Sequence, residues 1–253
     1  MPRLSPAGDI NEKSQDQTGE RGRVISLLTY NVHSCIGLDK RPDADRIAGI
    51  IRKLNPDVVG LQEITNRFGG PEEATQLDFL AAATGMKDVP GPTLLHAQGD
   101  YGNALLTRGE MRSVRRVDLN FRSREPRGAI DVEMDVDGSS LRVIVTHLGL
   151  RSSERRFQVR RLIEMFGASP TRPLVLMGDM NEWFPWGRPA RWLHRYFGRL
   201  PLLRTYPTFF PVFALDQILV YPREALRGLE VIVTPETKVA SDHLPLLARI
   251  DLG

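Results

Sequence analysis

The sequence lacks several features that define special classes of protein. Cys35 is the only cysteine among 253 residues, so an internal disulfide cannot form and the chain suits a reducing compartment. It has no apolar run long enough to cross a membrane and no apolar signal core at its N-terminus. These absences argue against a disulfide-stabilised secreted domain and an ordinary membrane protein, and we expect the protein to be cytoplasmic.

A large excess of charge is also absent. The chain carries 34 basic and 31 acidic residues, a net charge of +3, which is too small to favour a nucleic-acid-binding protein that performs no chemistry. Arginine greatly outnumbers lysine, and arginine binds phosphate groups through paired hydrogen bonds. A base-composition bias in the genome explains the same ratio, so the charge permits an anionic substrate without requiring one.

The chain divides into a short polar segment and one domain. Residues 1–22 are polar and show no apolar periodicity, which predicts a disordered N-terminal tail. Residues 23–253 contain no second linker, repeat or low-complexity tract. We expect this part to form a single domain.

Apolar patterns predict many short strands and few helices. They indicate strands at 24–30, 58–61, 130–136, 141–145, 173–177, 217–221, 229–233 and 246–250. Helices are predicted after a cap at Asp43, over 71–84 and over 154–166. Asp137-Gly138 is typical of a hairpin turn. We expect an α/β (α+β) fold in which stacked mixed sheets are flanked by helices.

Polar residues gather at the ends of these predicted strands. Asn31, Glu63, His147 and Asp179 follow strands, whereas Asp216 and the pair Asp242-His243 precede strands. A lone residue of this kind is usually a turn residue or a helix cap. If the last two strands run antiparallel to the others, all these positions meet at one edge of the core, where sites are commonly built. Clustered carboxylates repel without a cation, and oxygen ligands favour Mg²⁺ or Mn²⁺.

The same residues carry a resemblance to a known family. The segments TYNVHS (29–34), LQE (61–63), YGNALLTR (101–108), THLG (146–149), GDMNEW (178–183), LDQI (215–218) and SDHLP (241–245) are similar to the ordered motifs of the endonuclease/exonuclease/phosphatase (DNase I-like) superfamily. The resemblance is to small bacterial members and runs from Val24 to the C-terminus. It implies a four-layer sandwich, in which two β-sheets face each other and helices lie outside.

The resemblance also implies a metal site and a catalytic set. Asn31, Glu63 and Asp242 match the family's metal site, with Glu63 as the main ligand of Mg²⁺ or Mn²⁺. The matched catalytic residues are Asp179 and Asn181, which hold the attacking water and orient the phosphate, His243 with its carboxylate partner Asp216, and His147, which contacts phosphate oxygens. Either Asp179 or His243 is the base for the water; alternatively, His243 is a cation that stabilises the transition state.

Three further residues are predicted substrate contacts, and two of them have a plainer alternative. Asn103 matches a phosphate-contacting amide, or is an ordinary residue at the start of a strand. Arg151 opens the helix after His147, lies closest to the site and touches a substrate phosphate, whereas the other arginines of this helix form a solvated face. His33 points to the same side of an extended chain as Asn31 and lines the pocket, or is a polar loop residue.

Aromatic residues and arginines crowd the segment 183–213. This composition is typical of a surface that stacks on bases or of a patch that contacts lipid headgroups. A core-covering insertion with a solvated arginine face is the favoured interpretation, because aromatic residues most often pack. The segment must still supply most of the selectivity, since the domain has little other room for long binding loops.

The sequence therefore predicts a metal-dependent hydrolase of phosphate esters, in particular a phosphodiesterase that uses an in-line water. The alternatives are a DNA or RNA nuclease of the same family and a catalytically inactive module that binds a phosphate ligand. The substrate is a small molecule, a lipid headgroup or a nucleic acid, and the modest charge disfavours the last. No stable protein partner is implied, and we expect a monomer.

Deletion of residues 1–22 should leave the melting temperature and the activity unchanged, because this polar segment offers little to bury. Calorimetry and an activity assay on the shortened chain check this expectation. A fall of several degrees in melting temperature would show that the segment packs on the domain.

Overall fold

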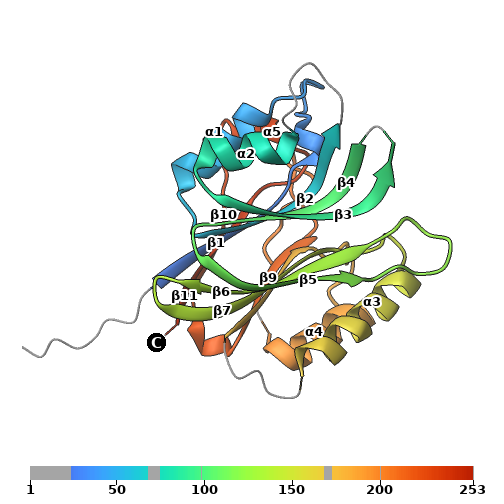
Figure 1. Ribbon diagram of the computed structural model, residues 1–253. Coiled ribbons are helices and arrows are strands. Elements are labelled where there is room, and N and C mark those ends of the chain that lie inside the picture. Colours follow the sequence, from blue (N-terminus) through green and yellow to red (C-terminus); the bar gives the residue numbers. More distant parts are fainter. Residues whose placement is uncertain (1–23, 68–74, 98, 168–172, 200, 253) are drawn as a thin grey trace, which may run out of the picture.

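The computed structural model describes residues 24–67, 75–97, 99–167, 173–199 and 201–252. The predicted tail lies outside these residues, as do positions 71–74 of the predicted helix 71–84. The described residues form two β-sheets and five α-helices, arranged in four layers (Figure 1). None of the helices in this part of the chain is long and apolar enough to cross a membrane.

The first sheet has six strands. They are β1 (Val24–Asn31), β2 (Val58–Arg67), β3 (Lys87–His96), β4 (Gly99–Thr107), β10 (Leu226–Val231) and β11 (Leu246–Asp251), in the order β10-β11-β1-β2-β4-β3. Its outer face is covered by α1 (Ala44–Leu54), α2 (Gln76–Thr84) and α5 (Thr237–Ala240) (Figure 1). Asp43 caps α1 as predicted, by accepting a hydrogen bond from the backbone nitrogen of Arg46.

The second sheet has five strands in chain order. They are β5 (Glu110–Asp118), β6 (Gly128–Val136), β7 (Ser139–His147), β8 (Leu174–Asp179) and β9 (Asp216–Tyr221). Its outer face is covered by α3 (Ser152–Phe166) and α4 (Arg188–Phe197) (Figure 1). The predicted hairpin joins β6 to β7, and Asp137 and Gly138 both have positive φ, as a tight two-residue turn requires. The four-layer sandwich of two mixed sheets is confirmed.

Alternate residues of each strand build the core between the sheets. Ile25 and Leu27 of β1 pack there with Val143 and Val145 of β7, whereas Leu28 of β1 faces the helices. This alternation follows from the strand geometry, in which successive side chains point to opposite faces. Where the alternation reaches the end of a strand, the last inward side chain also points between the sheets.

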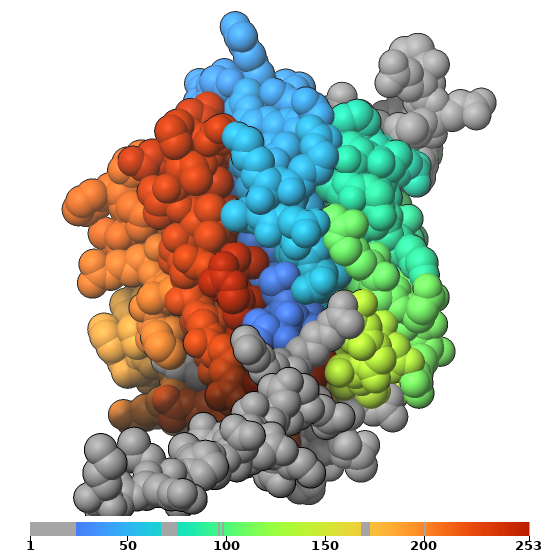
Figure 2. Space-filling model, turned by 90° about the vertical axis from the view of Figure 1, so that its left-hand side faces the viewer, coloured from blue at the N-terminus to red at the C-terminus, as the bar shows by residue number. Residues whose placement is uncertain are grey.

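The two ends of this core differ in character. One end holds the start of β1 beside the end of β11, where Val24 pairs with Asp251 (Figure 2). The strand β1 runs parallel to β2 and antiparallel to β11, and β8 runs parallel to β7 and antiparallel to β9. The polar residues that follow or precede these strands therefore lie at the opposite end, as the predicted strand directions require.

Two glycines allow the chain segments to approach closely near that polar end. A Cβ on Gly60 of β2 would lie 2.9 Å from the Cε atom of Met177, across the gap between the sheets. A Cβ on Gly178 of β8 would lie 1.8 Å from the carbonyl oxygen of Thr146, and its φ is +142°. Glycine is required at such a close approach with positive φ.

The sequence patterns do not predict β3, β4, β5 or α4. Proline interrupts β3 at Pro90 and Pro92, and this is tolerated because β3 is an edge strand. β5, an edge strand of the second sheet, is largely exposed and arginine-rich, so it has no apolar alternation to detect. The helix α4 did carry a local signal, because its buried residues Ala190, Leu193 and Phe197 recur at helical spacing between arginines.

Replacement of Gly178 by Ala should lower the free energy of unfolding by about 2–3 kcal/mol, because the new Cβ overlaps the Thr146 carbonyl. Gly228→Ala is the matched control, since a Cβ there meets no atom within 4 Å. Urea denaturation of both variants measures the difference. Equal stability of the two variants would contradict the close approach.

Candidate active site

The polar residues at the strand ends meet at one end of the inter-sheet core. Asn31, His147 and Asp179 are the last residues of β1, β7 and β8, and Asp216 is the first residue of β9. Each continues the inward alternation of its strand beyond the apolar core residues. All four side chains are buried. The end of the hydrophobic core is thus a polar cluster.

Glu63 reaches this cluster through an irregularity in β2. The predicted strand 58–61 is too short: β2 continues to Arg67, so Glu63 lies within the strand and does not follow it. The pairing of β2 with β4 shifts register between Leu61 and Ile64, and Glu63 has a φ of 62°. Regular alternation would place Glu63 on the face of Leu61, toward the helices. The bulge turns it toward Asn31 instead.

The amide of Asn31 joins carboxylates that come from different sheets. Its Nδ2 donates to Oε1 of Glu63 at 2.9 Å and to Oδ2 of Asp179 at 3.1 Å. Its Oδ1 accepts from the backbone nitrogen of His33 at 3.1 Å. The Oδ1 atom keeps a second lone pair beside this hydrogen bond, so the metal-ligand role of Asn31 stays a prediction. In the observed orientation Asn31 holds two carboxylates together.

Asp179 is the centre of the cluster. Its Oδ1 accepts from the backbone nitrogen of Asn181 at 2.8 Å, and its Oδ2 lies 3.5 Å from Nε2 of His147. The Nδ2 atom of Asn181 donates to Nε2 of His147 at 2.9 Å and to the carbonyl oxygen of Leu148 at 3.0 Å. That carbonyl fixes the amide orientation, so Nε2 of His147 accepts and its proton is on Nδ1.

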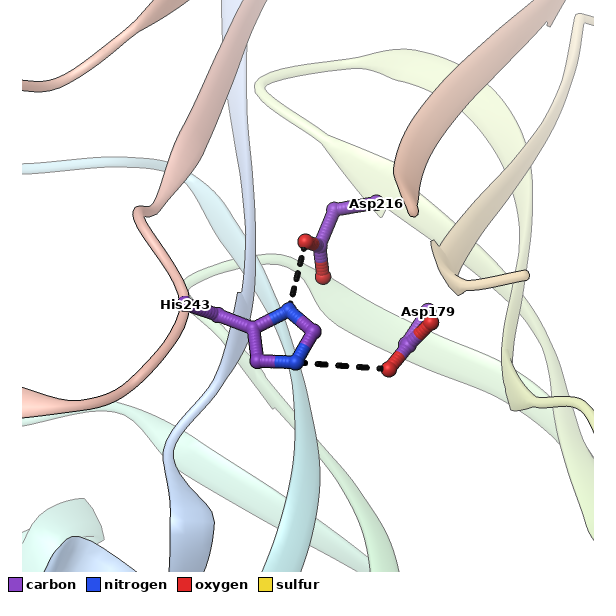
Figure 3. Close-up of side chains that lie close together, drawn as sticks. All are labelled: Asp179, Asp216 and His243. Carbon is purple, nitrogen blue, oxygen red and sulfur yellow. Dashed lines mark hydrogen bonds and ion pairs between the residues drawn. The ribbon is translucent and has the colours of Figure 1, made fainter. Parts of the chain in front are cut away.

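His243 lies between two carboxylates (Figure 3). Its Nδ1 donates to Oδ2 of Asp216 at 2.8 Å, and its Nε2 faces Oδ2 of Asp179 at 3.7 Å. The hydroxyl of Thr205 donates to the same oxygen of Asp216 at 2.6 Å. Asp216 is therefore fixed, and it orients the imidazole with Nε2 toward Asp179.

The two buried histidines have opposite pKa shifts. Burial alone would lower the pKa of His243, but the charge and hydrogen bond of Asp216, with the charge of Asp179, raise it to about 10. Burial lowers the pKa of His147 to about 4, against the charge of Asp179. His243 is thus a cation at neutral pH, and His147 is neutral. Because the folded state favours charged His243, its stabilising contribution is complete below pH 6.5 and is lost as the pH rises through about 10.

Glu63 and Asp242 form the solvent-open side of the cluster. His33 lies beside both, with its Nδ1 3.4 Å from Oε2 of Glu63 and 3.9 Å from Oδ1 of Asp242. Burial raises the pKa of Glu63, but the hydrogen bond from His33, the charge that His147 acquires below about pH 4 and the hydrogen bond from Asn31 together bring it down to about 2. Glu63 is therefore ionised throughout the neutral range.

A divalent cation fits this open side better than the buried side. Asp179, Asp216 and His243 are close enough together to surround an ion, but both ring nitrogens of His243 already face carboxylates. Glu63 and Asp242 instead offer partly exposed carboxylate oxygens, which are ligands that Mg²⁺ and Mn²⁺ prefer. The predicted metal residues are thus chemically suited to a hard cation.

The three predicted substrate contacts differ in position. His33 lies in the cluster, between Glu63 and Asp242. Asn103 is buried in β4, and its Nδ2 donates to the carbonyl oxygen of Gly128 at 3.0 Å, which links the two sheets. Arg151 is exposed where α3 begins. Contact of these residues with a substrate stays a prediction.

Sequence reasoning missed two tyrosines beside the site. Tyr101 is hydrogen-bonded to Glu63, and its burial together with the charge of Glu63 raises its pKa. The ring centroid of Tyr206 lies 4.7 Å from that of His243. Tyr101 begins the YGN segment used to select Asn103, so a signal was present. Tyr206 had no such signal, because its contact with His243 depends on how the loop after α4 folds back toward the site.

A four-layer sandwich with a carboxylate–histidine cluster at one end of its inter-sheet core defines the class of this protein. A sequence model of the Endonuclease/Exonuclease/phosphatase family matches residues 28–243. The chain belongs to this family, whose members are hydrolases that act on phosphate esters.

Individual relatives support the shared fold. The uncharacterized protein YbhP of Escherichia coli (strain K12) is 27% identical over 249 residues, which cover 90% of this chain and 96% of that protein. The endonuclease/exonuclease/phosphatase from Bacteroides vulgatus has a TM-score of 0.73 at 19% identity, over 91% of this chain and 100% of that chain. D. rerio TDP2 complexed with a single-strand DNA product has a TM-score of 0.68 at 17% identity, over 90% of this chain and 99% of that chain.

In the metal-free protein, Asp216→Asn should lower the pKa of His243 from about 10 toward its ordinary value of 6.5, because the neutral amide removes the charge that favours imidazolium. Nuclear magnetic resonance titration of the histidine rings measures this pKa. His147 is the internal control and should keep its pKa of about 4. An unchanged pKa for His243 would contradict the role of Asp216.

Proposed function

We propose that the protein is a divalent-metal-dependent phosphodiesterase in which water attacks phosphorus in line with the leaving oxygen. One observation carries this proposal: Asp179 lies between the Asn31 amide and the cationic His243. Its Oδ2 accepts from Nδ2 of Asn31 at 3.1 Å and faces Nε2 of His243 at 3.7 Å. Hydrolysis of a phosphate ester needs an acceptor for the water's proton and positive charge for the phosphate oxygens. Asp179 and His243 can meet these needs within one site.

Glu63, with Asp242 beside it, would hold Mg²⁺ or Mn²⁺. Bound there, the cation would neutralise charge on the phosphate oxygens and assist departure of the leaving oxygen. Asn31 and Tyr101 hold the Glu63 carboxylate by hydrogen bonds. These hydrogen bonds fix the orientation of the carboxylate that would bind the cation.

The pKa shifts favour one division of roles between Asp179 and His243. An imidazole that is already charged at neutral pH cannot accept a proton, and the pKa of His243 is raised to about 10. We therefore assign proton acceptance to Asp179 and stabilisation of the phosphate's negative charge to His243. Asn181 supports this arrangement, because its backbone nitrogen donates to Asp179 and its side-chain amide donates to neutral His147.

A small or lipid-linked phosphodiester is the proposed substrate. A nucleic acid would be gripped by a basic track several phosphates long, and the net charge of +3 supports only a short one. A nuclease is the second candidate, because the structurally similar D. rerio TDP2 is complexed with a single-strand DNA product. Both candidates use the same cluster of residues.

Replacement of Glu63, Asp179 or His243 by Ala should each lower turnover of an aryl phosphodiester about a hundredfold or more, since each change removes a metal ligand or a proton-handling group. A chelator should abolish the wild-type activity. Release of the aryl alcohol in saturating Mg²⁺ or Mn²⁺ measures turnover.

Glu110→Ala is the matched control, because Glu110 is a carboxylate on β5 whose side chain is 80% exposed. It should retain wild-type turnover. Near-wild-type activity of Glu63→Ala in saturating metal would remove Glu63 as the metal ligand, and wild-type activity that survives chelation would remove the metal from the proposal.

A further inference from the structure

Two loops beside the site expose large aromatic side chains to solvent. Phe184 and Trp186 follow the cluster residue Asn181 and are 53% and 71% exposed. Phe209 and Phe210 are 77% and 69% exposed. The sequence predicts that the aromatic residues of the segment 183–213 pack over the core. Phe197 is buried as predicted, but these four residues are exposed. Large exposed aromatic groups that lie close together mark an interaction surface.

The loops are anchored to the site and to each other. The ring of Tyr206 packs on His243, and the backbone nitrogen of Thr208 donates to the carbonyl oxygen of Asp242 at 2.8 Å. Trp183 packs edge-on against Tyr206 and Phe213, with ring centroids 5.8 and 4.8 Å apart. The exposed aromatic residues are therefore held at the rim of the site by a packed base.

The charged side chains that these loops and α4 contribute are of one sign. The segment 183–215 contains five arginines and no aspartate or glutamate, and these five exceed the net charge of +3 of the whole chain. All five arginine side chains are exposed: Arg188, Arg191, Arg195, Arg199 and Arg204. Three of them, with Trp186, line a groove of about 690 Å³ on the outer side of α4. The rim is thus both aromatic and cationic.

The shape of the aromatic turn distinguishes between two anionic partners. The backbone nitrogen of Phe210 donates to the carbonyl oxygen of Pro207 at 3.0 Å, so Phe209 and Phe210 occupy a tight turn. Adjacent exposed rings at a turn suit insertion into the boundary between headgroups and acyl chains. Successive nucleic-acid bases require ring faces spread along a groove. The turn therefore fits a lipid surface better.

We propose that the rim formed by residues 184–186, 206–210 and the arginines of 188–204 docks on an anionic phospholipid surface. The aromatic side chains enter the headgroup boundary, and the arginines contact lipid phosphates. This binding does not depend on catalysis. If the proposed function also holds, docking turns the mouth of the site toward the headgroup layer, so its phosphodiester substrate is one presented there.

Sedimentation of the full chain with vesicles tests the docking without any turnover. The vesicles are phosphatidylcholine alone and phosphatidylcholine mixed with phosphatidylglycerol, each at low and high ionic strength. We expect binding to the mixed vesicles, weakened by salt, with a blue shift of tryptophan fluorescence from Trp186. Phe209→Ser/Phe210→Ser and Arg191→Glu/Arg195→Glu should each weaken binding about tenfold or more.

Val24→Ser is the control, because Val24 is apolar, 51% exposed and at the opposite end of the molecule. It should bind like the wild type, and all variants should keep the wild-type melting temperature because the changed side chains are exposed. Failure of the wild type to bind mixed vesicles would overturn the proposal. Vesicle binding that both double variants retain would also overturn it. So would a Phe209→Ser/Phe210→Ser variant that binds vesicles like the wild type but binds single-stranded DNA, measured separately, more weakly.

Discussion

The site depends on the side-chain amide of Asn31. Its two N–H bonds go to carboxylates from different sheets, Glu63 and Asp179, and these carboxylates would repel each other without a shared donor. Hydrogen bonds to charged groups contribute about 1.5–3 kcal/mol each. The backbone carbonyl oxygen of Asn31 accepts from Oγ of Ser241 at 2.7 Å, which ties down the loop that carries His243. A single residue at the end of β1 thus connects both sheets and the loop before β11.

Backbone strain is concentrated around the same residues. Glu63, Asn181 and the run 33–35 all have positive φ, a conformation that costs on the order of 1–3 kcal/mol for a residue other than glycine. Local hydrogen bonds offset this cost: the backbone of Asn181 donates to Asp179, and the carbonyl oxygen of Ser34 accepts from Gln76. The strain aims side chains that regular strands would direct elsewhere. The apolar core supplies the rigidity that keeps them there.

The sequence predicts the parts of this structure that repeat and misses the parts that depend on distant contacts. Alternating apolar residues predict the inner strands and place Asn31 and Asp179 at strand ends, because an inward face must be apolar until the core stops. The bulge at Glu63 and the contact of Tyr206 with His243 leave no local signal, since both arise from pairing with other segments. The orientation of the Asn31 amide is likewise set by three separate partners. The residue type alone suggests a metal ligand and does not reveal this orientation. Exposure of Phe209 and Phe210 follows from a turn fixed against residues 241–244.

The central claim is that this cluster directs water to attack phosphorus. Its most direct test is hydrolysis of a phosphodiester by the full chain in water enriched in heavy oxygen, with Mg²⁺ present, followed by mass spectrometry of both products. Because water attacks phosphorus, we expect heavy oxygen to enter the phosphate product and the released alcohol to carry none. Heavy oxygen in the alcohol, or no metal-dependent hydrolysis of any phosphodiester, would contradict it.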